Sequence, residues 1–284
     1  MLIRTIFQKT ITFAAICLLI MFNIYTSRQA AIPTSATPNE AKLAVLMYHG
    51  FCENKKESTY VLDAKSFEED IIYLKENGFE FVSTADLINY SEHRAPLPQK
   101  CVMITFDDGY LNNYTYAFPI IKKYNVKTVI SPIAYWSDFN TENPDPNPSY
   151  ANMTWEQVKE MSQSGLVEFQ NHSYNMHSTD KGRKGSAKAS GETSDEYRRI
   201  FFNDFMKAHR AIYNATGTHP VAYAYPFGSI SDESKTILKC MDYKISFSCN
   251  SGFNYLKGKE DELFGLKRFN RTPEAPVSKL LADY

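Results

Sequence analysis

Short apolar runs alternate with amphipathic stretches along the chain from residue 44 onward. In the stretch Ser66–Asn77, the apolar residues Phe67, Ile71 and Leu74 recur at the spacing of one helical face, and Gly78 follows as a helix-ending residue. Short apolar runs bounded by turn residues predict buried strands. The predicted strands are Ala44–Tyr48, Phe79–Ser83, Cys101–Phe106, Thr128–Ile133, Leu166–Gln170, Val221–Tyr225, Lys244–Ser248 and Leu266–Phe269.

Helical periodicity fills most of the intervals between these strands. We predict helices over Ser66–Asn77, Ala85–Tyr90 with Thr84 as its cap, Tyr116–Tyr124, Trp155–Ser164, Asp195–Ala215, Asp232–Met241 and Pro276–Asp283. Residues 140–152 are rich in Pro and Asn and residues 180–194 in Gly, Lys and Ser, which predicts a surface loop and a flexible loop.

Strands that alternate with helices of this length predict a parallel sheet covered by helices. About seven such units, without a glycine-rich dinucleotide-binding turn, favour an α/β barrel over an open sheet. In such barrels the chemistry gathers at the carboxyl ends of the strands.

The first 40 residues differ from the rest of the chain. Arg4 and Lys9 precede an apolar run over residues 11–25, and a stretch rich in Ala, Pro, Ser and Thr follows. The run is short for a membrane span, which needs about 20 residues, and suits an export signal better. We therefore expect residues 1–40 to be a signal peptide or an uncleaved membrane anchor plus linker, with a buried helix as the alternative, and residues 41–284 to form the functional domain.

Composition narrows the classes of function. Hydrophobic residues make up 43% and charged residues 22% of the chain, which is typical of a globular protein. The 31 Lys and Arg balance 32 Asp and Glu, so bulk charge does not favour a nucleic-acid partner. The 14% of aromatic residues suits sugar-stacking surfaces but equally suits a dense core.

Two adjacent carboxylates end one of the predicted strands. Asp107 and Asp108 follow the apolar residues 102–106 and precede Gly109. Adjacent strand side chains point to opposite faces, so the pair does not resemble the converging carboxylates of a glycosidase. A bend at Gly109 would let one carboxylate bind a metal while the other lies beside it; an Asp-Asp-Gly turn with a capping Asp is an equally good interpretation.

Two histidines follow another predicted strand at the same sheet edge. His172 and His177 are five residues apart, so their rings converge only if the segment is looped rather than helical or extended. Two His and one carboxylate, with a coordination position left for water, are typical of a catalytic metal site. Two surface histidines are the alternative, but the nearby Asp107-Asp108 pair favours the metal site.

Two further strand ends carry candidate residues. Tyr225, Pro226, Phe227 and Gly228 form a turn whose backbone N–H groups can point into a site, although an ordinary strand-to-helix turn explains them as well. His49 stands where a buried strand meets a glycine, which makes it either a candidate acid or base or a core histidine.

Together these clusters resemble the polysaccharide deacetylases with the NodB homology domain, carbohydrate esterase family 4, over nearly all of the chain after residue 44. Residues 105–109, Thr-Phe-Asp-Asp-Gly, match the first motif of that family. His172-Ser173 and His177 resemble its second motif with one extra residue, a spacing similar to that of the subgroup acting on exported poly-N-acetylglucosamine. Residues 226–228, Pro-Phe-Gly, match the end of the third motif.

The chain departs from the family pattern at two places. Ala224 stands where the family has an Arg that orients the catalytic Asp, and we expect Arg268 on a late strand to replace it. The C-terminal Leu-x-His motif is absent, because no His lies beyond His219. The subgroup has a Tyr-His near its N-terminus instead, and Tyr48-His49 resembles it.

The resemblance implies a distorted (β/α)7 barrel and a role for each motif residue. Asp108, His172 and His177 would hold a divalent metal, zinc or alternatively Co²⁺ or Mn²⁺, and Asp107 would be the general base. The backbone N–H of Phe227, within the Tyr225–Pro226–Phe227 turn, would hold the oxyanion. His49 would protonate the leaving amine, and Arg268 would orient Asp107.

The implied function is removal of N-acetyl groups from amino sugars of a cell-surface or extracellular polysaccharide, of the poly-N-acetylglucosamine or peptidoglycan type. An esterase for O-acetyl xylan and a catalytically impaired carbohydrate-binding relative are the alternatives. We expect an exported monomer whose partner is the N-acetylated polysaccharide, in the cell envelope or outside it, with membrane attachment through the N-terminal segment if that segment is not cleaved.

Overall fold

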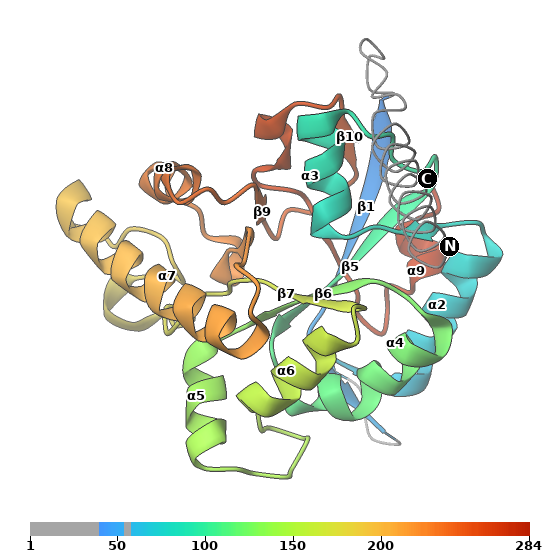
Figure 1. Cartoon of the computed structure of the whole chain (residues 1–284), viewed down its shortest axis with the longest axis horizontal. Coiled ribbons are helices and arrows are strands. Elements are labelled where there is room, and N and C mark those ends of the chain that lie inside the picture. The colour runs from blue at the N-terminus through green and yellow to red at the C-terminus, as the bar shows by residue number, and fades with distance from the viewer. Residues whose placement is uncertain (1–39, 54–57) are drawn as a thin grey trace, which may run out of the picture. The chain divides into compact units, whose positions relative to one another are not determined.

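The computed structural model describes residues 40–53 and 58–284 (Figure 1). The predicted signal or anchor segment lies outside the described residues, apart from residue 40 itself. Within the described part of the chain, no helix combines the length and the hydropathy that a membrane crossing requires.

The barrel is built on a largely parallel sheet. β1 pairs on one side with β5 and on the other with β11, all parallel, while β10 joins β1 antiparallel. The sheet contains β1 (Ala41–Tyr48), β4 (Glu80–Phe81), β5 (Cys101–Asp108), β6 (Thr128–Pro132), β7 (Val167–Phe169), β10 (Asn254–Leu256) and β11 (Phe269–Asn270).

Two further strands close this sheet into a ring. β8 (Ala222–Ala224) pairs with β9 (Ile245–Phe247). A parallel bridge from Asn171 to Tyr223 links the end of β7 to β8, and a parallel bridge from Phe247 to Leu266 links β9 to the segment that continues into β11 beside β1. The result is the distorted (β/α)7 barrel that the sequence predicts.

Alternation along the strands separates the barrel interior from its outer face. On β1, Leu43 and Val45 belong to one core cluster, whereas Ala44 and Leu46 belong to another. The first cluster also holds inward residues of β5, β8 and β9, and the second packs β1 and β5 against α2, α4 and α6. A third cluster joins β8 to α7 and α8, which lie side by side on one side of the barrel, with α2 and α4 on the other (Figure 1).

The helices agree with the predictions in most places. They are α2 (Ala64–Glu76), α3 (Thr84–His93), α4 (Phe118–Tyr124), α5 (Ala134–Glu142), α6 (Trp155–Gln163), α7 (Ser194–Thr216), α8 (Asp232–Cys240) and α9 (Val277–Leu280). The sequence did not predict α5, and it missed the short pair β2 (Gly50–Cys52) and β3 (Val61–Asp63) as well as β10. The cap of α3 is Ser83 rather than Thr84, because the Ser83 side chain accepts the backbone N–H of Asp86.

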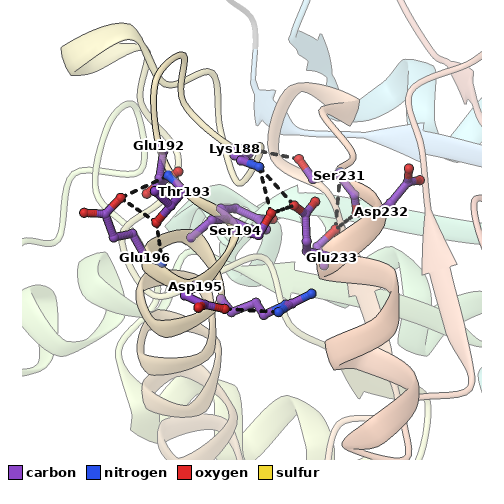
Figure 2. A network of polar contacts seen from close by, with 12 residues as sticks. Lys188, Glu192, Thr193, Ser194, Asp195, Glu196, Ser231, Asp232 and Glu233 are labelled. Atoms are coloured by element: carbon purple, nitrogen blue, oxygen red, sulfur yellow. Dashed lines mark hydrogen bonds and ion pairs between the residues drawn. The ribbon is translucent and has the colours of Figure 1, made fainter.

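Polar contacts tie the 180–194 segment, predicted as a flexible loop, to α7 and α8 (Figure 2). Lys188 Nζ lies 3.0 Å from Ser194 Oγ and 3.1 Å from Glu233 Oε1, and its backbone N–H donates to Ser231 Oγ at 2.9 Å. Gly185 packs so closely on the turn that follows β8 that an added Cβ would lie 2.4 Å from the Pro226 carbonyl oxygen. The segment is therefore held against one wall of the site described next.

Candidate metal centre and active site

The inward-facing rows of three strands lead to three polar residues at the carboxyl end of the barrel. Asp107 continues the row of Cys101 and Met103 on β5, two residues at a time, and His49 continues the row of Leu43 and Val45 on β1. On the strand that closes the barrel, Arg268 follows Leu266 in the same way. A period of two thus brings these side chains into the barrel mouth.

Asp107 and Arg268 form a buried, two-pronged ion pair. Arg268 Nη1 lies 2.8 Å from Asp107 Oδ1, and Nη2 lies 2.7 Å from Oδ2. The guanidinium is fixed further by Nε, which donates to the Ser248 carbonyl oxygen at 2.9 Å. Burial raises the pKa of Asp107, but the charge of Arg268, assisted by the nearby His172, outweighs it and keeps that pKa below its ordinary value. The carboxylate is therefore ionised and held in one orientation.

The backbone turns sharply after Asp107. Asp108 has φ 69° and Gly109 has φ 74°, so two consecutive residues adopt the left-handed conformation. A Cβ at Gly109 would lie 2.6 Å from the Cβ of Pro132 on β6, which requires glycine there. The Asp108 carbonyl oxygen accepts the side-chain N–H of Asn152 at 2.9 Å. This bend interrupts strand alternation and lets Asp108 lie beside Asp107 rather than on the opposite face.

Asp108, His172 and His177 each offer one ligand atom, and these atoms lie within 4.8 Å of one another. His172 Nε2 and His177 Nε2 both lie 3.5 Å from Asp108 Oδ1. That oxygen is buried and has no hydrogen-bond partner. A buried carboxylate oxygen without a hydrogen-bond donor, flanked by two imidazole nitrogens, is a donor set that fits a divalent metal.

The orientation of His172 also suits a ligand. Its Nδ1 lies 2.7 Å from the Ala224 carbonyl oxygen, so Nδ1 carries the proton and leaves the Nε2 lone pair directed at Asp108. Burial lowers the pKa of His172, but the negative charges of Asp107 and Asp108 outweigh it and raise that pKa. The same negative potential would stabilise a bound cation.

The segment between the two histidines is folded onto α7. Ser173 has φ 75°, and its Oγ accepts the backbone N–H of Met176 at 3.1 Å. On α7, Asp204 accepts the backbone N–H groups of Tyr174 and Asn175, each at 2.7 Å. These bonds make the looped path that lets His172 and His177 converge.

His49 lies within the electrostatic field of the same cluster. Burial lowers its pKa, while the charges of Asp107 and Asp108 act in the opposite direction. Its ring contacts the ring of Tyr60 at 4.9 Å, and its carbonyl oxygen accepts the side-chain N–H of Asn113 at 2.7 Å. The structure therefore places His49 beside the carboxylates without making it one of the three metal-site residues.

The turn after β8 divides its residues between the site and the core. Phe227, at φ 56°, is 39% exposed and its ring centroid lies 4.3 Å from that of His177. Pro226 is buried at the start of the turn. The Tyr225 side chain points the other way, into the cluster with α7 and α8, where its hydroxyl accepts from Ser234 at 3.1 Å. The Tyr225 side chain therefore packs away from the metal-site residues, and its place in the oxyanion turn stays a prediction.

Sequence reasoning missed two polar residues that shape the site, Asp204 and Asn152. Asp204 lies on a long amphipathic helix, where a polar residue near the core face gives no functional signal. Asn152 stands in a Pro- and Asn-rich stretch that reads as a plain loop. Neither could have been found without knowing that α7 and the 143–152 segment reach the barrel mouth.

Comparison with known proteins agrees with this geometry. A family model described as polysaccharide deacetylase matches residues 94–246. A poly-β-1,6-N-acetyl-D-glucosamine N-deacetylase of Escherichia coli K12 is 27% identical over 246 residues, covering 79% of this chain and 36% of the relative, so the chain spans about a third of that protein's length.

Two solved structures are similar in fold. A de-N-acetylase from Aggregatibacter actinomycetemcomitans superposes with a TM-score of 0.74 at 26% identity, covering 86% of this chain and 100% of the other. IcaB from Ammonifex degensii superposes with a TM-score of 0.69 at 26% identity, covering 84% and 95%. The family match over more than half of the chain confirms the resemblance seen in the motifs: this chain belongs to the polysaccharide deacetylase family.

Proposed function

We propose that this chain is a metal-dependent hydrolase that removes N-acetyl groups from amino sugars of an exported polysaccharide, with poly-N-acetylglucosamine as the first candidate substrate and peptidoglycan as the second. The observation that carries the proposal is the convergence of Asp108, His172 and His177 around an unpartnered buried oxygen, directly beside the ionised Asp107. The 27% identity to an N-deacetylase and the fold match to a de-N-acetylase support the choice of reaction.

The cofactor in this proposal is a divalent metal held by Asp108, His172 and His177, zinc first, with Co²⁺ or Mn²⁺ as alternatives. When bound there, it would supply a Lewis acid for the acetamide carbonyl and acidify a water molecule. An acidified water matters because Arg268 keeps Asp107 a weak base, able to take a proton only from a donor of low pKa.

The chain's own residues perform the remaining steps. Asp107 accepts a proton from water, and the resulting hydroxide attacks the acetamide carbonyl carbon. The backbone N–H of Phe227 donates to the oxyanion that forms. The bond from carbon to nitrogen then breaks, and His49 donates the proton that the leaving amine requires, giving acetate and a free amino sugar. Burial lowers the pKa of His49, which makes its protonated form a better donor.

The remaining parts of the proposal concern location. Residues 1–40 would direct export, as a cleaved signal or as an anchor, and residues 41–284 would act as a monomeric catalytic domain in the cell envelope or outside the cell. The apolar run after Arg4 and Lys9 supports export.

Metal analysis combined with an acetate-release panel tests the proposal. The purified full chain, supplied with zinc, should release acetate from β-1,6-linked N-acetylglucosamine oligomers faster than from peptidoglycan fragments or acetylated xylan. Asp108→Ala should lose the metal, whereas Asp107→Ala should retain it and lose turnover. His49→Ala should retain the metal and turn over more slowly.

Asp195→Ala, at an exposed carboxylate on α7, is the matched control and should change neither readout. Normal zinc content in Asp108→Ala would overturn the ligand assignment. Zinc binding without acetate release from any substrate of the panel would instead favour the carbohydrate-binding alternative.

A further inference from the structure

A groove of about 450 Å³ runs between α5 and the connection that leads from α5 to α6. Figure 1 shows this connection as the long loop below both helices. Its size is within the range of ligand sites. We call it the α5 groove; its lining includes Trp136, Phe139, Asn143, Asp145, Tyr150 and Asn152.

Three of the lining side chains are large, aromatic and exposed. Trp136 is 42%, Phe139 is 45% and Tyr150 is 62% exposed. Trp136 and Phe139 lie on one face of α5 with their ring centroids 6.0 Å apart at 83°, so they present ring faces in two directions. Exposed aromatics gathered in one groove are typical of a binding surface rather than of a core.

Both walls of the α5 groove are bonded to the segments that carry the metal-site residues. On one wall, the Asn152 side chain donates to the Asp108 carbonyl oxygen at 2.9 Å. The backbone N–H of Asn152 donates to Asn140 Oδ1 at 3.0 Å, which holds Asn152 in place. On the other wall, the first residue of α5, Ala134, donates its N–H to the Ser173 carbonyl oxygen at 3.2 Å. The groove therefore lies next to the segments that carry Asp108 and His172.

The polar lining indicates what kind of ligand fits. Asn143 and Asp145 interleave with the rings, and none of the side chains that line this groove is Lys, Arg or His. By contrast, the neighbouring groove between α6 and α7 has Lys159, Lys207 and Arg210 in its lining, beside Asp138 and Glu156. The α5 groove is thus unsuited to anionic polymers or anionic headgroups, and it suits a neutral sugar or one that already carries a free amine.

We propose that the α5 groove binds a sugar unit of the polysaccharide next to the unit being deacetylated, with Trp136 as the stacking platform and Asn143 and Asp145 as hydrogen-bonding partners. A sugar ring has an apolar C–H face and polar edges, which is the combination that this lining offers. The inference rests on the proposed function and adds the residues that would make the enzyme prefer chains over single sugars.

Tryptophan fluorescence tests binding independently of turnover, because Trp136 and Trp155 are the two tryptophans of the chain. In the full chain with Trp155→Phe, a β-1,6-linked N-acetylglucosamine pentasaccharide should cause a saturable change in emission, recorded by stopped flow before turnover. The change should disappear in Trp136→Phe, which retains Trp155. An unresponsive Trp136, or a response to phosphatidylglycerol vesicles in place of the pentasaccharide, would overturn the proposal.

Kinetics provide the second readout. Trp136→Ala should lower the ratio of kcat/KM for the pentasaccharide to kcat/KM for N-acetylglucosamine by about tenfold, since stacking is worth roughly that factor. Tyr255→Ala, at an exposed aromatic on β10 outside the groove, is the control and should leave the ratio unchanged. An unchanged ratio in Trp136→Ala would refute the subsite. A wild-type chain inactive on every substrate would defeat the proposed function alone, because the fluorescence test would still report on the groove.

Discussion

Two buried aspartate–arginine pairs lie on opposite faces of the same barrel wall, and only one of them belongs to the candidate active site. Asp107 pairs with Arg268 inside the barrel mouth. Asp70 of α2 pairs with Arg271, whose Nε lies 2.7 Å from Asp70 Oδ2 and whose Nη2 lies 3.1 Å from Oδ1. Asp70 Oδ2 also accepts a hydrogen bond from the Tyr48 hydroxyl at 3.0 Å, in the layer between the sheet and α2.

The pKa values of the two carboxylates are shifted in opposite directions, although each carboxylate has a guanidinium partner. Burial raises the pKa of Asp70 above its ordinary value, and Arg271 does not fully offset it. Asp107 is buried as deeply, yet Arg268, together with the histidines at the barrel mouth, keeps its pKa low. The arginine alone therefore does not distinguish the two carboxylates; the imidazoles of His172 and His49 beside Asp107 do.

The largest expected effect comes from removing the charge of each carboxylate without changing its shape. Asp107→Asn should lower the rate of acetate release by roughly 10³-fold, within the range for loss of a general base. Asp70→Asn should leave the rate near that of the wild type, because Asp70 of α2 contacts β1 and the C-terminal segment rather than the site. Circular dichroism should verify that both variants are folded. A folded Asp70→Asn that is equally inactive would remove the functional distinction between the pairs.

Replacing either arginine should lower the stability of the protein by a similar amount, but only the replacement of Arg268 should lower turnover. Arg268→Met and Arg271→Met should each lower the free energy of unfolding by about 3–5 kcal/mol, because each leaves a buried charge unpaired. Only Arg268→Met should also reduce turnover per folded molecule, by roughly 100-fold, since Asp107 then loses its orientation and its low pKa. Urea unfolding and initial rates measure the two effects.

Double variants separate stability from chemistry. Asp70→Leu with Arg271→Met should recover most of the lost stability and retain activity, since a buried ion pair can often be replaced by apolar side chains. Asp107→Leu with Arg268→Met should recover stability but remain inactive. Activity in the second double variant would contradict the role of Asp107.

The comparison also shows what the sequence could and could not predict. Strand periodicity and motif spacing identified the barrel and brought Asp107, Asp108, His172 and His177 to one edge, because parallel strands place their carboxyl ends together. The pairing of Arg268 with Asp107 was expected only from the family resemblance. It spans 161 residues and depends on the closure of the barrel through β11, which no local pattern contains.

Other features depended on tertiary contacts of the same kind. Helix α5 was missed because its sequence mixes Tyr, Trp, Phe and Asn, which have weak helix propensity, and only Ile133 separates it from the end of β6 at Pro132. The left-handed backbone of Asp108 was not predicted either; the sequence placed the bend at the next residue, Gly109, which packs against Pro132. These are cases in which packing overrides local propensity.

A third carboxylate, Asp204, extends the comparison because it accepts backbone N–H groups instead of pairing with an arginine. Asp204→Ala should weaken zinc binding by about 10–100-fold, the usual range for a residue that orients metal ligands, because the turn between His172 and His177 loses two hydrogen bonds. Competition with a chelator measures the affinity without reference to turnover. Asp195→Ala, on the same helix and exposed, is the matched control; equal zinc affinity in both variants would make Asp204 a purely structural residue.

The smallest expected effect is the opposite pH dependence of the two pairs. Asp70 has a folded-state pKa above the ordinary 3.8, so the folded protein takes up its proton first, and the stability of the wild type relative to Asp70→Asn should rise as pH falls through that pKa toward 3.8. Asp107 has a folded-state pKa below 3.8, so its contribution is fully present above 3.8 and should be lost as pH falls below it. Each pKa unit corresponds to about 1.4 kcal/mol.

Urea unfolding of the wild type and of both Asn variants between about pH 3 and pH 6 measures how the free energy of unfolding of the wild type, minus that of each variant, depends on pH. Because each substitution removes one charge, general charge effects cancel between these two difference curves. Difference curves of the same sign would show that the two buried pairs are electrostatically equivalent.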